Sequence, residues 1–334
     1  MRPRTLLGRG TCVLGPPQRP QSLCMIAAGP CARDTTSVAS DIEYAEKLAR
    51  QRGLQLSLRY AGTTEELREA LGAFSADPTV SAGLIVGAVE PCDLGRWAAE
   101  SRLRWVLGGE FYERKRRAPV LDQVVYDWYY FFEGATRHLL ERGARRPALF
   151  ICRSEFVWSA DKISAFRTAC ESAGLPPDAQ PVVDLHAGLP LRHEPGPPYV
   201  RHLARSILRA LDLWGHSGKW PDAVLLPGTH LQLWFDCLRR RPEAGAALEQ
   251  IEVYAWGLSD DRDGELATIY PAPITWVTWD TADRIREALV RLLDSGPSPG
   301  DLRRQHVRPY RITREAPGEL EPAGAGQTAL LQHP

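Results

Sequence analysis

Residues 124–175 decide the fold that this chain is predicted to adopt: VVYDWYYFFEGATRHLLERGARRPALFICRSEFVWSADKISAFRTACESAGL. The run at 147–152 is short and wholly apolar, and on each side of it apolar residues recur at helical spacing. A strand without polar positions has to be covered on both faces, which is typical of a parallel sheet. The order helix, strand, helix therefore predicts an α/β fold with right-handed crossovers.

The same alternation extends in both directions along the chain. Thr63 and Glu66 have the spacing of a capping box, and they open a predicted helix that runs to Phe74. Because strands and helices alternate throughout, the sheets are predicted to be parallel and doubly wound. The expected strands lie at 22–28, 54–60, 81–86, 103–107, 123–126, 147–152, 179–185, 220–226, 251–256, 273–277 and 307–313.

Length and composition narrow the class of protein. A chain of 334 residues is too long for one small core and fits two lobes of ordinary size. Its 41 basic and 41 acidic side chains balance, so no overall basic field attracts nucleic acid. The seven cysteines include no CxxC pair, which favours reduced thiols in a cytosolic protein. No apolar run approaches the roughly 20 residues that span a bilayer. Glycines and prolines interrupt the N-terminus, so no signal-peptide core is expected and the predicted location is cytoplasmic.

A set of short motifs resembles the middle of a LacI/GalR-family effector domain, and the resemblance continues to about Arg314. The motifs are Asp127, Gly134-Ala135, His138-Leu139, 141–143, Arg145-Arg146, 165–167 and 173–175. The resemblance implies two Rossmann-like lobes of the periplasmic-binding-protein type I, joined by three crossovers around a ligand cleft. It places 21–126 and 271–303 in the first lobe, with the 273–277 segment re-entering that lobe, and 127–270 and 304–314 in the second. Residues 315–334 have the composition of a disordered tail.

Residues 1–20 are set apart from this fold. The string GRGTCV at 8–13 resembles the wing of a GntR-type winged-helix domain, and the proline-rich GPPQRP at 15–20 has the composition of a tether. This resemblance implies that operator DNA would be bound only through an upstream winged-helix domain, and that the lobes alone would not bind DNA specifically. A disordered basic tail explains the same string equally well.

In open parallel sheets ligands bind at the carboxyl ends of the strands, so residues just after each strand are candidates for a binding site. After the first strand come Arg33 and Asp34, which are either ligand-facing polar groups or a capped helix start. Glu110 follows the fourth strand, where it either hydrogen-bonds a ligand hydroxyl or is solvated.

Three further candidates rest on the family resemblance. Asp127 stands in the place of the acidic member of the family's Asp-Asn pair, and Trp128 replaces the Asn, which adds an aromatic face suited to stacking on a sugar ring. An Asp before a helix is equally an N-cap. Lys162 stands where family members commonly carry an arginine that contacts the ligand. It keeps the charge without the bidentate fork, and its alternative is a solvated lysine on a helix face.

The remaining candidates lie in or near the second lobe. Thr229 and His230 occupy a loop where the family usually has Asn-Asp or Asp-Asp. Trp256 replaces a common phenylalanine of the family, Trp158 lies on a loop expected to face the cleft, and Trp279 follows the segment at the hinge. Each tryptophan is either a stacking platform or part of the packing. The resulting hypothesis is a flat, modestly polar ligand such as a saccharide.

Enzyme signatures are missing from the sequence. It contains no GxSxG elbow, no Walker loop, no HExxH and no GxGxxG after the first strand, so neither an enzyme nor a cofactor is expected. His186 and His193 share a loop rich in proline and glycine. Without a nearby cysteine or a third ligand, both are expected to be solvated rather than to bind a metal.

The favoured function is a ligand-responsive transcription regulator. A small-molecule effector would close the cleft and change the geometry of a homodimer that pairs residues 39–48 and 283–292. The alternative is a stand-alone solute-binding protein of the same fold, which would carry an export signal. A third reading, an enzyme on a doubly wound fold, lacks any nucleophile and base that the sequence identifies.

Overall fold

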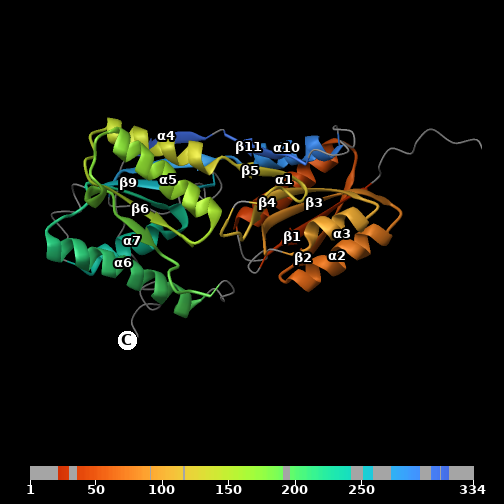
Figure 1. Ribbon diagram of the computed structural model, residues 1–334, viewed down its shortest axis with the longest axis horizontal. Coiled ribbons are helices and arrows are strands. Elements are labelled where there is room, and N and C mark those ends of the chain that lie inside the picture. The colour runs from red at the N-terminus through yellow and green to blue at the C-terminus, as the bar shows by residue number, and fades with distance from the viewer. Residues whose placement is uncertain are drawn as a thin grey trace, which may run out of the picture.

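The computed structural model describes residues 22–29, 36–90, 92–115, 117–190, 196–241, 251–258, 272–293, 302–308 and 310–315. They form two α/β lobes that lie end to end, each built on a six-stranded sheet (Figure 1). Residues 1–20, Arg33, Asp34 and nearly all of the predicted tail at 315–334 lie outside the described residues.

The first lobe is an all-parallel sheet in the order β11-β5-β4-β3-β1-β2. Its strands are β1 (Ser22–Ala28), β2 (Gln55–Ala61), β3 (Val80–Val89), β4 (Arg104–Phe111), β5 (Asp122–Tyr126) and β11 (Arg304–Val307). Helices α1 (Thr36–Gln51) and α10 (Thr281–Leu293) pack on one face, and α2 (Thr64–Ala76) and α3 (Leu94–Glu100) pack on the other. Alternate residues of β1 enter the two resulting cores, because side chains of a strand point to opposite faces. The run at 22–28, which is apolar at every position after Ser22, is therefore buried throughout.

The second lobe has the strand order β12-β10-β9-β8-β6-β7, parallel except where β12 runs antiparallel to β10. Its strands are β6 (Pro147–Ile151), β7 (Val182–Asp184), β8 (Ala223–Pro227), β9 (Glu252–Leu258), β10 (Ile274–Trp279) and β12 (Arg311–Glu315). Helices α4 (Trp128–Glu141) and α5 (Val157–Ser172) cover one face, and α6 (Pro197–Ser217) and α7 (Leu231–Arg239) cover the other (Figure 1). Two short 3₁₀ turns, η1 (Pro177–Ala179) and η2 (Gly228–His230), complete the lobe.

The chain crosses between the lobes three times, as predicted: from β5 to α4, from β10 to α10 and from β11 to β12. Two strands near the C-terminus nevertheless lie in the opposite sheet from the expected one. β10 pairs with β9, so the 273–277 segment stays in the second lobe and the chain re-enters the first lobe only at α10. β11 pairs with β5 of the first lobe, and the single strand expected at 307–313 is two strands. A run such as ITWVTW fits either buried sheet, so local sequence does not assign it.

Two local features, of which the sequence predicted the first, explain how elements begin and meet. The capping box is present: Thr63 Oγ1 accepts from the Glu66 amide at 3.1 Å, and the Glu66 carboxylate accepts from the Thr63 amide at 3.2 Å. Gly134 on α4 lies directly against the Tyr310 hydroxyl, and a Cβ atom at this position would overlap it. Glycine at 134 therefore lets the last crossover pack on α4.

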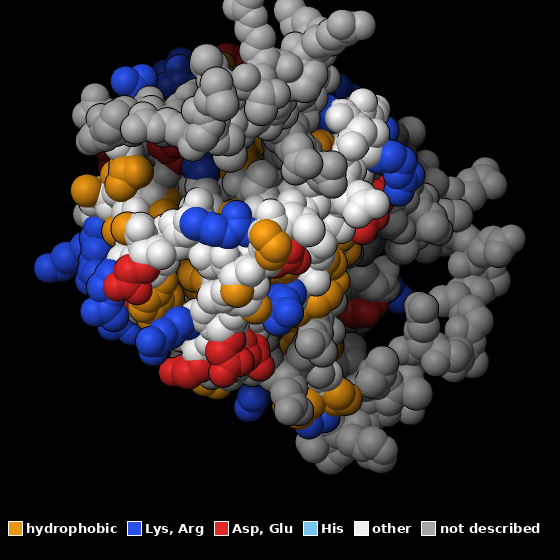
Figure 2. All heavy atoms as spheres, turned by 90° about the vertical axis from the view of Figure 1, so that its right-hand side faces the viewer, with side chains coloured by type: hydrophobic (Ala, Val, Ile, Leu, Met, Phe, Trp, Pro, Cys, Tyr) orange, Lys and Arg blue, Asp and Glu red, His pale blue; other side chains and the backbone are white. Residues whose placement is uncertain are grey.

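The end of the first lobe that Figure 2 shows is not a basic face. On the end of the molecule seen in Figure 2, basic, acidic and apolar side chains are interspersed among the described residues. Among the described helices, none combines the length and apolar character of a membrane span.

Candidate functional site

The two lobes meet where loops follow β4 and β6. The Val157 amide donates to the Glu113 carbonyl across this junction at 2.9 Å. The Tyr112 ring contacts Phe156 and Trp158, with centroids 5.2 and 5.1 Å apart. The carboxyl ends of β4 and β6 therefore face each other, and such ends are where α/β sheets bind ligands. Trp158, one of the predicted site residues, packs into this contact between the lobes.

Four of the predicted residues come together beside the junction, and we call Trp128, Lys162, Trp256 and Trp279 the tryptophan–lysine cluster. Trp128 begins α4, Lys162 lies on α5, Trp256 lies in β9 and Trp279 ends β10. The Trp128 and Trp279 rings meet edge to face with centroids 4.8 Å apart, and Trp256 and Trp279 stack at 6.2 Å. The cluster forms because residues that follow or end parallel strands reach the same edge of the sheet.

Lys162 is a buried charge held by aromatic rings. Its side chain is only 7% exposed, and its Nζ lies 4.2 Å from the centroid of Trp128 and 4.4 Å from that of Trp256. These are cation–π distances. Its ammonium makes no hydrogen bond or ion pair within the part of the chain that the structure describes. Burial lowers the pKa of Lys162 to about 8. A buried cation without an acceptor is what a site for a ligand oxygen requires.

Glu110 lies on the first-lobe side of the cluster, at the end of β4. Its Oε1 accepts from the Trp128 Nε1 at 3.0 Å, and burial raises the pKa of this carboxyl to about 7. The indole Nε1 atoms of Trp256 and Trp279 are buried and have no hydrogen-bond partner among the described residues. The cluster and Glu110 therefore bring a cation, two indole N–H donors and a carboxyl group together beside apolar ring surfaces.

The shifted pKa of Glu110 predicts a specific pH dependence of stability. Because the folded pKa is about 7 against an ordinary 4.5, the folded protein retains a proton that the unfolded chain releases. The free energy of unfolding is therefore expected to fall as the pH rises from 4.5 to about 7. Glu110→Gln should remove this fall, as measured by urea unfolding across the window. Glu69→Gln, at an exposed position of α2, is the matched control, and equal pH slopes for wild type and Glu110→Gln would contradict the assignment.

The other predicted site residues lie elsewhere. Asp127 caps α4 by accepting from the Tyr130 amide at 3.1 Å, and its Oδ2 accepts from Arg308 Nε at 2.9 Å. Thr229 is exposed in η2. Neither contacts the tryptophan–lysine cluster through an interaction that the structure shows. Asp127 is thus the N-cap of α4, which was the alternative role predicted for it from the sequence.

The expectation that His186 has no cysteine or third ligand nearby is wrong. Cys152 and His230 lie beside it, and their ligand atoms are all within 4.8 Å of one another. His193, its expected companion, lies outside the described residues. The error arose because these three residues are far apart in sequence and meet only through the strand order β7-β6-β8.

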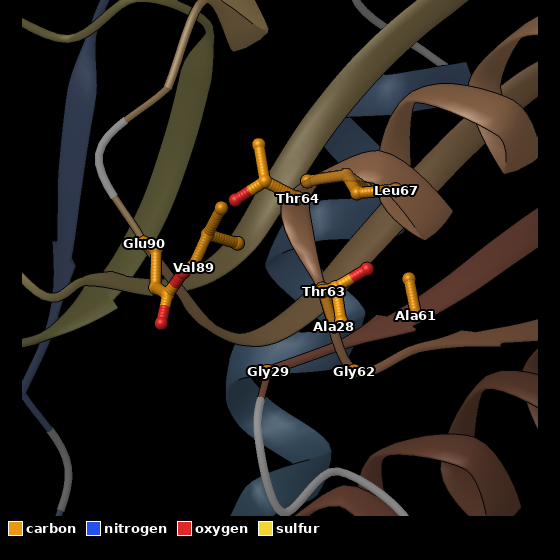
Figure 3. A pocket seen from close by; sticks show the side chains of 9 residues that line it. All are labelled: Ala28, Gly29, Ala61, Gly62, Thr63, Thr64, Leu67, Val89 and Glu90. Atoms are coloured by element: carbon orange, nitrogen blue, oxygen red, sulfur yellow. The ribbon is translucent and has the colours of Figure 1, made fainter. Parts of the chain in front are cut away.

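A small pocket opens at the carboxyl edge of the first sheet (Figure 3). Its cavity volume is only about 10 Å³, and its walls are the ends of β1, β2 and β3 with the start of α2. Thr63, Thr64 and Glu90 supply its polar side chains. Glu90 ends the stretch after the third strand, where a binding site was expected.

One buried pair near the junction escaped sequence analysis. Arg284 Nη2 on α10 donates to Asp41 Oδ1 on α1 at 2.6 Å, and the two residues are 7% and 0% exposed. The guanidinium also lies over the Tyr126 ring, 4.7 Å from its centroid. The pair connects a helix that follows a crossover to the first helix of the chain.

Known proteins share this architecture. No protein-family model matches the sequence, and no curated protein does. Among solved structures, a putative LacI-family transcription regulator from Rhizobium etli matches with a TM-score of 0.68 at 17% identity, over 90% of this chain and 100% of that one. A complex of the transcription regulator CelR with cellobiose matches with a TM-score of 0.62 at 18% identity, over 89% and 85%. The lac repressor dimer bound to operator and an anti-inducer matches at 0.62 and 14%, over 90% and 95%.

The fold is thus a pair of parallel-sheet lobes of the periplasmic-binding-protein-like kind. More particularly, it is the fold of the effector-binding domain of LacI-family regulators, as the sequence resemblance implied.

Proposed function

We propose that the two lobes form the effector-binding and dimerisation part of a ligand-responsive transcription regulator. The observation that carries the proposal is the buried Lys162 ammonium, which lies among tryptophans at the lobe junction without a hydrogen-bond partner among the described residues. A protein gains little stability from such a charge, because burial removes its water. A ligand oxygen that accepts a hydrogen bond from Lys162 would compensate for the water that burial removes from the ammonium.

The ligand class that fits is a saccharide or a similarly hydroxylated ring. The C–H faces of such a ring pack on tryptophan faces, and its hydroxyls accept from Lys162 and from the indole N–H groups of Trp256 and Trp279. Glu110 would accept from another hydroxyl. The CelR complex, a structural neighbour, contains cellobiose, which supports this choice. Binding between the lobes would stabilise one relative orientation of them, and so transmit a signal.

A thermal-shift screen with neutral mono- and disaccharides tests the proposal. A ligand that binds only the folded state raises the melting temperature, with about 2.7 kcal/mol of stabilisation at 100 times its Kd. Trp128→Ala should abolish the shift, whereas Trp97→Ala, on α3 of the first lobe, should retain it. A shift that survives Trp128→Ala would place the binding site elsewhere.

The functional assembly is proposed to be a homodimer that pairs α1 and α10 with the same helices of a second copy. These helices already lie side by side in the first lobe, bridged by Arg284 and Asp41 (Figure 1). Operator contact is assigned to a separate winged-helix domain. Sedimentation equilibrium measures the assembly, and a strictly monomeric chain at high concentration would contradict this part of the proposal.

A further inference from the structure

The loops that follow β6, β8 and β7 bring a thiol and two imidazoles together at one edge of the second sheet. Cys152 directly follows β6, His230 ends η2 after β8, and His186 lies two residues beyond β7. The Sγ of Cys152 is 3.8 Å from the Nε2 of His230, and the ligand atoms of all three residues lie within 4.8 Å of one another. The three side chains are partly buried.

These spacings are close to those of a metal centre. Zinc bonds of about 2.3 Å to sulfur and 2.0–2.1 Å to nitrogen, arranged tetrahedrally, separate ligand atoms by about 3.3–3.7 Å. The Cys152–His230 pair is nearly at that spacing already. The widest separation of ligand atoms exceeds the tetrahedral spacing by about 1 Å. Rotation of an imidazole about its side-chain bonds would close this difference.

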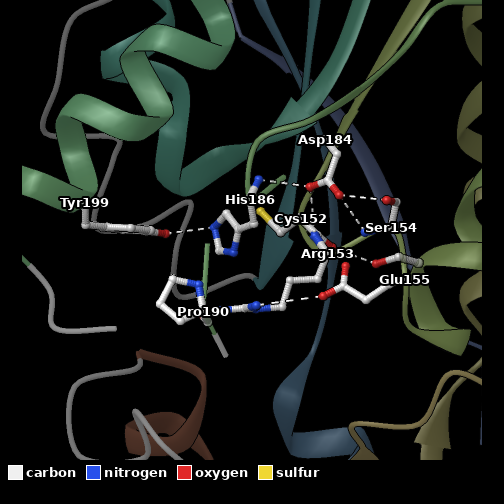
Figure 4. A network of polar contacts seen from close by, with 9 residues as sticks. Cys152, Arg153, Ser154, Glu155, Asp184, His186, Pro190 and Tyr199 are labelled. Carbon is white, nitrogen blue, oxygen red and sulfur yellow. Dashed lines mark hydrogen bonds and ion pairs between the residues drawn. The ribbon is translucent and has the colours of Figure 1, made fainter. Parts of the chain in front are cut away.

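The backbone around the cluster is held in place by Asp184 at the end of β7 (Figure 4). Its Oδ1 accepts from the amides of Arg153 and His186 at 3.0 and 2.9 Å, and its Oδ2 accepts from the Ser154 amide at 2.8 Å. Arg153 adopts φ 60°, an uncommon conformation for a residue other than glycine. One carboxylate therefore fixes the two loops that carry Cys152 and His186, as a preorganised site requires.

Tyr199 on α6 orients the ring of His186. Its hydroxyl lies 2.9 Å from the Nε2 of His186. A dashed line joins the two residues in Figure 4. When Nε2–H donates to this hydroxyl, Nδ1 carries the lone pair that a metal needs. Metal-binding histidines almost always have such an outer hydrogen bond on the second nitrogen.

We propose that Cys152, His186 and His230 bind a Zn²⁺ ion. One thiolate and two imidazoles select a borderline-soft transition metal over Mg²⁺ or Ca²⁺, which prefer oxygen ligands. Three protein ligands leave the fourth tetrahedral position for water or for an atom of another ligand.

Binding of the ion replaces the S–H bond of Cys152 by a Zn–S bond, and the thiol proton leaves to buffer.

The test is direct titration of the full chain, freed of metal with a chelator, first with Zn²⁺ and then with Co²⁺. Wild type is expected to bind one equivalent of Zn²⁺ in competition with a chromophoric chelator. Co²⁺ should give the ultraviolet thiolate-to-metal charge-transfer band and the intense visible bands of a tetrahedral site. Cys152→Ser should remove the charge-transfer band and weaken Zn²⁺ binding at least about 100-fold.

Matched variants separate this centre from other thiols and from surface histidines. Cys237→Ser, on α7 in the same lobe, and His216→Ala, at the exposed end of α6, should leave the stoichiometry and the spectrum unchanged. Tyr199→Phe should lower the Zn²⁺ affinity about 10-fold without removing the Co²⁺ band, because it removes an outer partner and no ligand. Melting curves recorded in chelator confirm that each variant is folded.

Two outcomes would overturn the proposal. One is wild-type protein that gives no charge-transfer band with Co²⁺. The other is a band that persists in Cys152→Ser, which would move the thiolate to a different cysteine. Neither outcome depends on the identity of the effector, so failure here and failure of the proposed function are distinguishable.

Discussion

Replacing Lys162 by methionine is expected to abolish the response to the saccharide effector and, at the same time, to stabilise the protein without ligand. Methionine has nearly the same length and keeps the contact with Trp128 and Trp256, but it offers no ammonium. A ligand hydroxyl or other acceptor oxygen then loses its charged partner. Hydrogen bonds to charged groups are worth about 1.5–3 kcal/mol, which is roughly a 10- to 150-fold loss of affinity.

The gain in stability follows from the sign of the pKa shift. Burial holds the pKa of Lys162 at about 8, below its ordinary 10.5. Below pH 8 the folded state therefore carries a buried charge that destabilises it relative to the unfolded chain. The cation–π contacts offset only part of this penalty. Lys162→Met should therefore raise the free energy of unfolding at neutral pH by about 1–3 kcal/mol. Lys219→Met, at an exposed lysine that follows α6, is the control and should change neither quantity appreciably.

The two measurements are urea unfolding and titration with whichever saccharide raises the melting temperature of wild type. A variant that loses stability would show that the aromatic contacts outweigh the desolvation of Lys162. A variant that binds the effector as tightly as wild type would remove Lys162 from the site. Stabilisation with loss of binding is the pattern of a residue retained for function at the expense of the fold.

Periodicity found nearly every element of the two sheets, because buried parallel strands are apolar at all positions and their helices are apolar on one face. The strand at 22–28 and the Thr63–Glu66 capping box were predicted at the residues where they occur. The limits and the sheet of the C-terminal strands could not be predicted in the same way. β11 and β12 contain RQHV and RITRE, which have few apolar positions, so no buried run marked their limits or their sheet.

The candidate site was predictable one residue at a time but not as an arrangement. Trp128, Lys162 and Trp256 were identified from their positions in the family resemblance and Trp279 from its place after the hinge segment, and the structure places the four in one cluster. Whether a tryptophan packs or stacks depends on contacts between distant segments, which one sequence does not specify. The grouping of Cys152, His186 and His230 needed the order β7-β6-β8. Parallel neighbours end at the same edge, so a known strand order would have predicted it.

Arg284→Met is expected to give the largest loss of stability of any change discussed, about 3–5 kcal/mol. The reason is the negative charge of Asp41, which stays buried when Arg284 is replaced. Asp41 is completely buried, and the Arg284 guanidinium that neutralises it comes from a helix 243 positions away in the chain. Removing the arginine takes away a buried cation that Asp41 contacts between α1 and α10, and a carboxylate this deeply buried is costly to keep charged.

Arg286→Met is the matched control. It lies two residues further along α10, and its partner Asp283 is three positions away on the same helix, with the Arg286 side chain 56% exposed. Exposed pairs of this kind contribute at most about 1 kcal/mol. Urea unfolding of both variants measures the difference, and equal losses would show that the buried pair is no stronger than a surface one.

The double variant Arg284→Met with Asp41→Leu separates the interaction from the burial of its charges. If the loss in Arg284→Met comes mainly from the buried charge of the Asp41 carboxylate, removing that carboxylate as well should recover most of the stability. If the double variant stays as unstable as the single one, the contact of Arg284 with the Tyr126 ring is the larger contribution. In that case the pair mainly fixes how α10 lies in the first lobe, and its loss should also alter the dimer that α1 and α10 are proposed to form.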